Sequence, residues 1–216
     1  MLYTQTVERK TLELLKTLMR DPQLEPFALV GGTALTLYMG HRMSVDIDLF
    51  SLEPFHASEM EKHMVGRYGF DSLMLRNNTL MGKIHNIKID LITLAYPRLQ
   101  PYTMEEGIRL YSLEDIAAMK LSAIADTGTR LKDFVDVAFL STGMSLNDML
   151  AAYGKKYSNS NSVRALKGLS YHNDILFDEQ INLLSGKYNW EHIRQRIADM
   201  VRFPAKIFNN WPTEKE

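Results

Sequence analysis

The chain has 216 residues and a formal net charge of −1, with 45% hydrophobic and 24% charged residues, the profile of an ordinary globular protein. It contains no cysteine, which excludes disulfides, thiolate catalysis and cysteine-ligated zinc. The near-neutral charge excludes a global basic field, so any RNA contact must come from a local patch. The polar start and the absence of a membrane-length apolar run predict a cytoplasmic protein.

The first elements are predicted from the spacing of apolar residues. Residues 5–20 carry the apolar stripe of an amphipathic helix, which ends before Pro22 because the residue preceding a proline disfavours helix. Residues 27–30 form a short apolar run typical of a buried strand. A Gly31-Gly32-Thr33 turn follows, and then a helix-length segment that ends at Gly40.

The strand predicted at residues 45–50 carries two aspartates. Side chains alternate along a strand, so Asp46 and Asp48 share one face. Two neighbouring carboxylates repel each other unless a cation lies between them, and hard oxygen ligands suit Mg²⁺ bound together with substrate phosphates. The glycines of the preceding turn let the backbone approach a phosphate, where the next helix presents unpaired N–H groups. These features predict a metal and nucleotide site; the alternative is a solvated strand end.

The middle of the chain is predicted to hold a helix at 54–67 and then three strands, at 70–75, 79–84 and 87–92. Asn77-Asn78 is placed as the turn of a hairpin between the first two strands. Asp90 stands inside the apolar third strand, so it requires a partner. That partner is either a metal ion or a neighbouring lysine, Lys88 or Lys83.

From residue 101 onward the pattern predicts helices, at 113–125, 130–140, 145–157, 162–169 and 189–203. Lys120 is the only cation on the first helix, and it either meets a phosphate or extends into solvent. Asp133 and Asp136 share one face of the second helix, where they either support a site or pair with Arg130 and Lys132. A basic and aromatic group is a candidate RNA patch, with a solvated helix face as its alternative: Lys155, Lys156, Tyr157, Arg164 and Lys167.

Together these elements predict an α+β fold, in which a small mixed sheet is flanked by helices and followed by a helical C-terminal half. Residues 1–100 are expected to form the core that carries the aspartates. Residues 101–216 are expected to form a helical part that completes the nucleotide site.

The order of strand, Gly-Gly-Thr turn, helix and D-x-D strand resembles the DNA polymerase β-like nucleotidyltransferase superfamily. GGTAL before HRxSxDIDLF, and MKLSAIAD before RLKDFVDVAFL, resemble more narrowly the AbiEii/AbiGii family of nucleotidyltransferase toxins, over about residues 24–140. The resemblance implies that Asp46, Asp48 and Asp90 are the catalytic residues and metal ligands. It also implies a nucleotide-binding set: Gly31, Gly32, Thr33, Arg42, Ser44, Lys120, Asp133 and Asp136. Thr127 departs from the pattern, since members often carry a basic residue there.

The activity that this resemblance implies is Mg²⁺- or Mn²⁺-dependent transfer of a nucleoside monophosphate from an NTP to an acceptor hydroxyl. It further implies a bacterial toxin of a type IV toxin–antitoxin or phage-defence system, with a cognate antitoxin and with tRNA as one acceptor. Two alternatives stay open at this point. One is a metal-dependent nuclease, which also uses clustered carboxylates but has no need of the glycine turn. The other is a degenerate member that binds without catalysing transfer.

Overall fold

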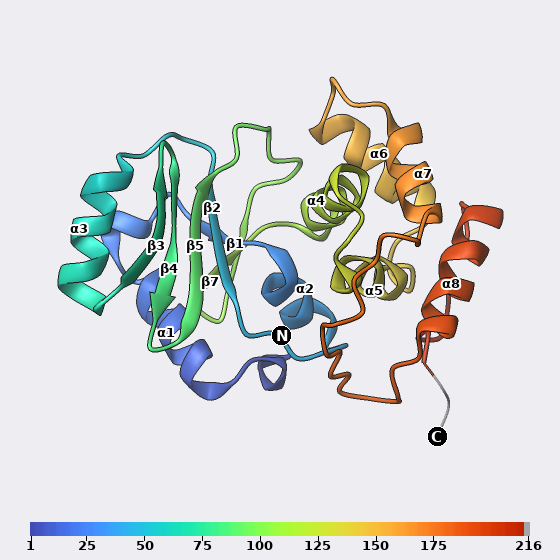
Figure 1. Ribbon diagram of the computed structural model, residues 1–216, viewed down its shortest axis with the longest axis horizontal. Coiled ribbons are helices and arrows are strands. Elements are labelled where there is room, and N and C mark those ends of the chain that lie inside the picture. Colours follow the sequence, from blue (N-terminus) through green and yellow to red (C-terminus); the bar gives the residue numbers. More distant parts are fainter. Residues whose placement is uncertain (214–216) are drawn as a thin grey trace. The chain divides into compact units, whose positions relative to one another are not determined.

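The computed structural model describes residues 1–213 and divides into two compact units (Figure 1). The first, the sheet unit, consists of Met1–Gly40 and Ser44–Ser112. The second, the helical unit, consists of His41–Met43 and the chain from Leu113 onward. Three residues in the middle of the predicted nucleotide motif therefore belong to the helical unit.

The sheet unit is built on a seven-stranded sheet with the order β3-β4-β5-β2-β1-β7-β6. The pairs β2–β5 and β1–β7 are parallel and the other neighbouring pairs are antiparallel, so the sheet is mixed as predicted. The strands are β1 (Ala28–Leu29), β2 (Ile47–Ser51), β3 (Asp71–Arg76), β4 (Thr79–Ile84), β5 (Ile87–Thr93), β6 (Thr103–Glu105) and β7 (Ile108–Leu110).

One row of leucines across the sheet forms part of its core. Leu49 of β2, Leu91 of β5 and Leu80 of β4 are partners across the strands, and each is at most 1% exposed. Because side chains alternate along each strand, the neighbouring row points to the opposite face. That row contains Asp48 and Asp90, which explains how two carboxylates fit between strongly apolar residues.

The sheet unit contains two hairpins, of which the sequence predicts one. The β3–β4 hairpin is confirmed, with Asn77 and Asn78 between the strands and Asn78 in the left-handed region at φ 57°. The β6–β7 hairpin overturns the expectation that the chain is helical from residue 101. Its strands have three residues each, too few to show an alternating pattern, and their turn is the Glu106-Gly107 pair, both with positive φ.

Arg109 shows why the second hairpin matters for the core. Its buried guanidinium donates to the backbone carbonyls of Met19, Leu24 and Phe27, at 2.7–2.9 Å. These carbonyls belong to the segment that leads from the first helix into β1. One side chain therefore satisfies three acceptors of an irregular segment and fixes the entry to β1.

Three α-helices belong to the sheet unit: α1 (Arg9–Met19), α2 (Gly31–Met39) and α3 (Ala57–Tyr68), with 3₁₀ turns at Thr4–Thr6 and Pro22–Leu24. All three α-helices were predicted, with start points that differ by a few residues. α2 ends at Gly40, whose φ of 71° is the left-handed conformation common after a helix.

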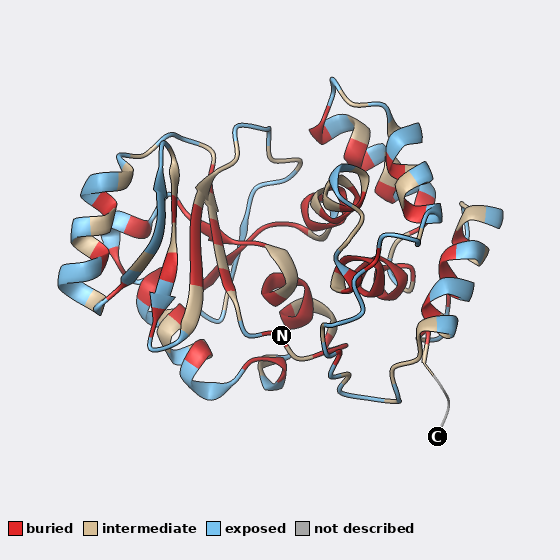
Figure 2. Ribbon diagram, viewed as in Figure 1, coloured by how far each residue is buried: buried red, intermediate tan, exposed pale blue. Residues whose placement is uncertain are grey.

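The helical unit contains α4 (Leu113–Asp126), α5 (Leu131–Leu140), α6 (Leu146–Lys156), α7 (Ser162–Ser170) and α8 (Trp190–Arg202). All five were predicted, and Ser145 caps α6 by accepting from the backbone N–H of Asp148. Figure 2 shows α5 buried along almost its whole length. The buried residues of α5 include Asp133 and Asp136. Within residues 1–213 no helix has the length and apolar character needed to cross a bilayer.

Candidate active site

The carboxylate face of the sheet unit is defined by Asp46, Asp48 and Asp90. Asp48 and Asp90 are direct partners in the parallel β2–β5 register, so they lie side by side on one face of the sheet. Asp46 comes directly before β2 and is half-buried, as is Asp48, whereas Asp90 is only 4% exposed. The predicted D-x-D pair and the third aspartate are thus brought into one region by strand pairing.

Lys88 pairs with one carboxylate of this face. Its Nζ lies 2.8 Å from Asp90 Oδ2, so the salt bridge that was the alternative for Asp90 is present in the structure. Burial lowers the pKa of Lys88, but the hydrogen bond to Asp90 and the charges of Asp90, Asp48 and Asp46 outweigh it and raise that pKa. The ammonium therefore lies in the combined field of all three carboxylates.

Gly31 of the glycine turn lies directly against the side chain of Asp48. Its φ is 69°, and a Cβ built on it would overlap with Asp48 Oδ2. The backbone of the preceding residue, Val30, donates to the carbonyl of Asp48 at 2.9 Å. Only glycine therefore lets the start of α2 and the side chain of Asp48 occupy their positions together.

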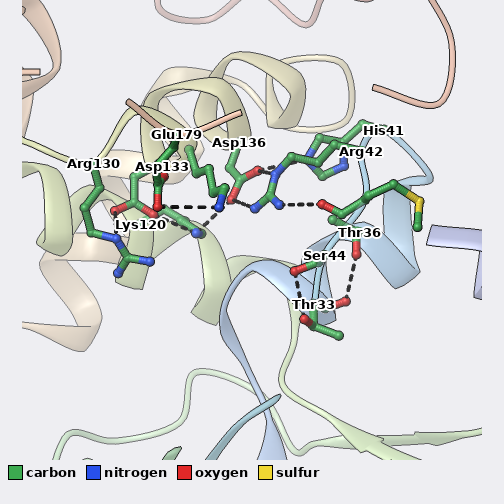
Figure 3. A network of polar contacts seen from close by, with 12 residues as sticks. Thr33, Thr36, His41, Arg42, Ser44, Lys120, Arg130, Asp133, Asp136 and Glu179 are labelled. Atoms are coloured by element: carbon green, nitrogen blue, oxygen red, sulfur yellow. Dashed lines mark hydrogen bonds and ion pairs between the residues drawn. The ribbon is translucent and has the colours of Figure 1, made fainter. Parts of the chain in front are cut away.

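Thr33 and Ser44 hold the chain that leads into β2, as Figure 3 shows. Thr33 Oγ1 contacts Ser44 Oγ at 2.8 Å and donates to the backbone carbonyl of Asp46. The backbone N–H of Ser44 donates to the carbonyl of Thr6 at 2.9 Å. Both hydroxyl side chains are buried, so in this structure they position Asp46 and do not face solvent.

The helical unit holds an ionic network centred on Asp136 (Figure 3). Asp136 Oδ1 accepts from Arg42 Nε at 2.7 Å and from His41 Nε2 at 2.9 Å, and Oδ2 accepts from Arg42 at 2.8 Å. Lys120 Nζ lies 2.7 Å from Asp136 Oδ2 and 2.7 Å from Asp133 Oδ1. The four charged residues, all at most 7% exposed, form a neutral buried cluster.

Electrostatics keeps this cluster ionised. Burial raises the pKa of Asp136, but Arg42 and Lys120 dominate and hold it well below its usual value. Burial lowers the pKa of Lys120, yet Asp133 and Asp136 raise it overall. For His41, burial prevails over Asp136 and lowers the pKa, so the ring is neutral and its Nε2 carries the proton that the carboxylate accepts.

The carboxylate face meets the chemical requirements of a Mg²⁺ or Mn²⁺ site. Asp90 Oδ1 is buried and has no hydrogen-bond partner within the described chain. No group of three Asp, Glu or His side chains among residues 1–213 is arranged as a complete metal cluster. Mg²⁺ is commonly held by one or two carboxylates, and substrate phosphates complete its coordination shell. Asp48 and Asp90 are therefore suitable protein ligands for such an ion.

The predicted site residues thus fall into two sets. The sheet unit brings together Asp46, Asp48, Asp90, Gly31, Gly32, Thr33 and Ser44, and the helical unit brings together Arg42, Lys120, Asp133 and Asp136. The assignment of these residues to catalysis, metal binding or nucleotide binding stays a prediction. The pairing of Asp133 with Arg130 is present at 3.8 Å, while Lys132 lies 3.5 Å from Glu179.

The prediction of an RNA patch is wrong for two of its residues, Lys156 and Tyr157. Lys156 is 1% exposed and its Nζ lies 2.7 Å from Asp115 Oδ1, and Tyr157 is 7% exposed. Both belong to the core of the helical unit and face away from solvent. Arg164 is exposed and pairs with Asp126 at 3.0 Å, and Lys155 and Lys167 are exposed.

The chain is similar to several known proteins. A family model described as the nucleotidyl transferase AbiEii toxin of a type IV toxin–antitoxin system matches residues 13–206. An uncharacterised protein of Aquifex aeolicus is 33% identical over 154 residues, which are 68% of this chain and 74% of that protein.

Solved structures resemble the fold at low sequence identity. MenT4, a nucleotidyltransferase toxin of Mycobacterium tuberculosis, has a TM-score of 0.58 and 15% identity, covering 89% of this chain and 84% of its own. JHP933 of Helicobacter pylori has a TM-score of 0.55 and 18% identity, covering 92% of this chain and 93% of its own.

The mixed sheet, the strand–glycine–helix turn and the family match define the protein as a nucleotidyltransferase. More narrowly, the chain belongs to the AbiEii nucleotidyltransferase toxin family. The predicted family, fold class and enzyme class are confirmed.

Proposed function

We propose that the protein transfers a nucleoside monophosphate from an NTP to an acceptor hydroxyl, with Mg²⁺ or Mn²⁺ at the carboxylate face. One observation carries the proposal: Asp48 and Asp90 are register partners, and the absence of a side chain at Gly31 leaves room for the Asp48 carboxylate. Paired carboxylates beside the N-terminus of a helix offer metal ligands and phosphate donors in one place. A nuclease would need the carboxylates but not the glycine turn.

In this reaction the acceptor oxygen forms a bond to the α-phosphorus, and the bond from that phosphorus to the oxygen bridging to the β-phosphorus breaks. Pyrophosphate leaves, and the acceptor hydroxyl loses its proton. A bound divalent cation would lower the pKa of the acceptor hydroxyl and neutralise charge on pyrophosphate. Asp46, Asp48 and Asp90 are the proposed ligands and catalytic residues.

The other residues of the sheet unit have supporting roles in this proposal. Gly31 and Gly32 form the first two residues of α2, whose free N–H groups and dipole favour a phosphate. Thr33 and Ser44 keep Asp46 in place through the contacts at its backbone carbonyl. The family pattern supports a role in nucleotide binding for Arg42, Lys120, Asp133 and Asp136.

The biological part of the proposal follows from the family. Its members are toxins of type IV toxin–antitoxin systems, so we propose that a cognate antitoxin restrains this enzyme. We propose tRNA as the first acceptor to test. Exposed Lys155, Arg164 and Lys167 are the remaining candidates for contacts with its backbone.

The test is incubation of the purified protein with each labelled NTP, Mg²⁺ or Mn²⁺, and total RNA. We expect label transfer to RNA that depends on the divalent ion. Asp48→Asn should reduce the rate by more than about a hundredfold, because even outer-shell partners of a metal cost ten- to a hundredfold.

Asp71→Asn is the matched control, since Asp71 is an exposed carboxylate of the same sheet, on β3. It should leave the rate unchanged. Shortened RNA without label would favour the nuclease, and transfer at the wild-type rate by Asp48→Asn would refute the site. Transfer only to a protein or a small molecule would refute the RNA acceptor alone.

A further inference from the structure

Lys88 occupies a position that the reaction itself does not explain. It stands two residues before Asp90 on β5, so its side chain emerges on the carboxylate face. The Nζ–Oδ2 distance of 2.8 Å makes Lys88 the counter-ion of a carboxylate that is only 6% exposed. The other oxygen of that carboxylate, Oδ1, has no hydrogen-bond partner in the described part of the chain.

The lysine itself is held much less firmly than the aspartate. Its side chain is 43% exposed, and four rotatable bonds allow the ammonium to move into solvent. Because the ammonium is already partly solvated, its move from Asp90 into water is inexpensive when a stronger cation takes its place. Asp90, in contrast, is buried and requires a positive partner at all times.

We propose that Lys88 is a built-in counter-ion of the carboxylate site, which competes with the divalent cation for Asp90 and is displaced when the metal–nucleotide complex binds. This inference rests on the proposed function, since it assumes that the metal binds at Asp48 and Asp90. It adds that the metal without a nucleotide binds weakly, because it must displace Lys88 from Asp90. The displaced ammonium stays on the carboxylate face, where the charge of the triphosphate compensates it.

The rival explanation is a salt bridge that only stabilises the sheet. The two explanations differ in their effect on metal affinity. If Lys88 competes, its removal strengthens metal binding; if it only stabilises the sheet, its removal leaves the affinity unchanged. Lys83 of β4 offers a matched control, because it is the register partner of Lys88, is exposed, and has no ion-pair partner within residues 1–213.

The experiment measures free Mn²⁺ by electron paramagnetic resonance during titration of wild type, Lys88→Met, Lys88→Arg and Lys83→Met. Each protein is titrated with and without a non-hydrolysable NTP analogue. Lys88→Met should bind Mn²⁺ alone about tenfold more tightly than wild type, the equivalent of one charge-assisted hydrogen bond. The enhancement of Mn²⁺ binding by the analogue should shrink correspondingly. Lys88→Arg and Lys83→Met should match wild type.

Thermal unfolding supplies a second readout that does not depend on activity. Without metal, Lys88→Met should melt below wild type because Asp90 loses its counter-ion, and Mn²⁺ should raise its melting temperature more than that of wild type. Equal Mn²⁺ affinity in Lys88→Met and wild type, or weaker affinity in the variant, would overturn the role of Lys88. If none of the proteins binds Mn²⁺ even with the analogue, the metal site of the proposed function fails and this inference fails with it.

Discussion

Gly31 and Asp48 occupy adjoining space: a Cβ on Gly31 would overlap with Oδ2 of Asp48. The two residues lie in different elements, since Gly31 starts α2 and Asp48 belongs to β2. Position 31 therefore requires glycine for two reasons: its φ is positive, and a Cβ would collide with the neighbouring carboxylate. This contact couples the geometry of the glycine turn to the orientation of a predicted metal ligand.

Gly31→Ala should damage both stability and activity. We expect the free energy of unfolding to fall by more than about 1 kcal/mol, because a left-handed conformation alone costs an alanine roughly 1–2 kcal/mol. Transfer should fall more steeply than the folded fraction, since Asp48 must move. Chemical denaturation and the labelled-NTP assay measure the two effects.

Gly66→Ala is the control for that substitution. Gly66 lies inside α3, and a Cβ there would have no neighbour within 4 Å. Alanine in a helix interior is favoured over glycine by roughly 0.5–1 kcal/mol, so this variant should be more stable and fully active. A Gly31→Ala protein with wild-type stability and rate would show that the contact with Asp48 has no consequence.

The second prediction concerns Lys120, whose ammonium pairs with both Asp133 and Asp136. Lys120→Met leaves Asp136 with Arg42, and leaves Asp133 with only the exposed Arg130 at 3.8 Å. Breaking a buried pair costs about 3–5 kcal/mol, so the variant should be strongly destabilised. The double variant Lys120→Met/Asp133→Asn restores a balanced Arg42–Asp136 pair and should recover most of the lost stability. Urea unfolding of the two variants tests this.

The double variant and Asp133→Asn alone separate structure from nucleotide binding at Lys120. Calorimetry with an NTP analogue should show weaker binding by the double variant than by Asp133→Asn alone, if Lys120 contacts the nucleotide as the family pattern implies. Equal affinity of these two proteins would leave Lys120 with a purely structural role.

The sequence predicts the elements better than their pairing. Alternation along a strand places Asp46 and Asp48 on one face, but their alignment with Asp90 depends on the parallel β2–β5 register, which spans a hairpin and a helix. The strands β6 and β7 are too short for any periodicity to reveal them. Their place in the sheet depends on the pairing of Leu29 with Leu110, a long-range contact.

Charged side chains show the same division between local and long-range information. Lys155 and Lys156 are adjacent and chemically identical in the sequence, yet one is exposed and the other is buried against Asp115. Helical periodicity separates their faces but does not say which face meets α4. Lys88 is only two residues from Asp90, so local sequence is enough to suggest a salt bridge between them, and the structure contains that salt bridge.

The third prediction is a pH dependence that comes from His41. Its pKa in the folded protein is lowered below the ordinary 6.5, chiefly by burial, against the opposing effect of Asp136 and with Arg42 and Lys120 adding to the lowering. As the pH falls below 6.5, the unfolded chain takes up a proton at this histidine before the folded protein does. Stability should therefore decrease as the pH falls from about 7.5 to about 5.5.

His41→Gln provides the comparison, because its amide can still donate to Asp136 but does not titrate. The other histidines contribute equally to both proteins, so the difference between their stability–pH profiles isolates His41. Urea unfolding at several pH values should give a smaller slope for His41→Gln. Identical slopes would mean that the buried ring does not resist protonation.

The last prediction uses the neighbouring lysines of α6. The side chains of Lys156 and Asp115 are both 0% exposed, and the pair joins α6 to α4 inside the helical unit. Lys156→Met should cost about 3–5 kcal/mol, because it removes the positive charge that faces a buried carboxylate. That is a large share of the roughly 5–15 kcal/mol that stabilises a typical domain.

Lys155→Met is the matched control, since Lys155 is the preceding residue on the same helix and is exposed. Its stability should stay within about 0.5 kcal/mol of wild type. The double variant Lys156→Met/Asp115→Leu should recover much of the loss, because an apolar pair of similar volume avoids the desolvation of both charges. Chemical denaturation of the three proteins decides the question. If Lys156→Met were as stable as Lys155→Met, Lys156 would not be the buried partner of Asp115 and would return to the candidate RNA patch.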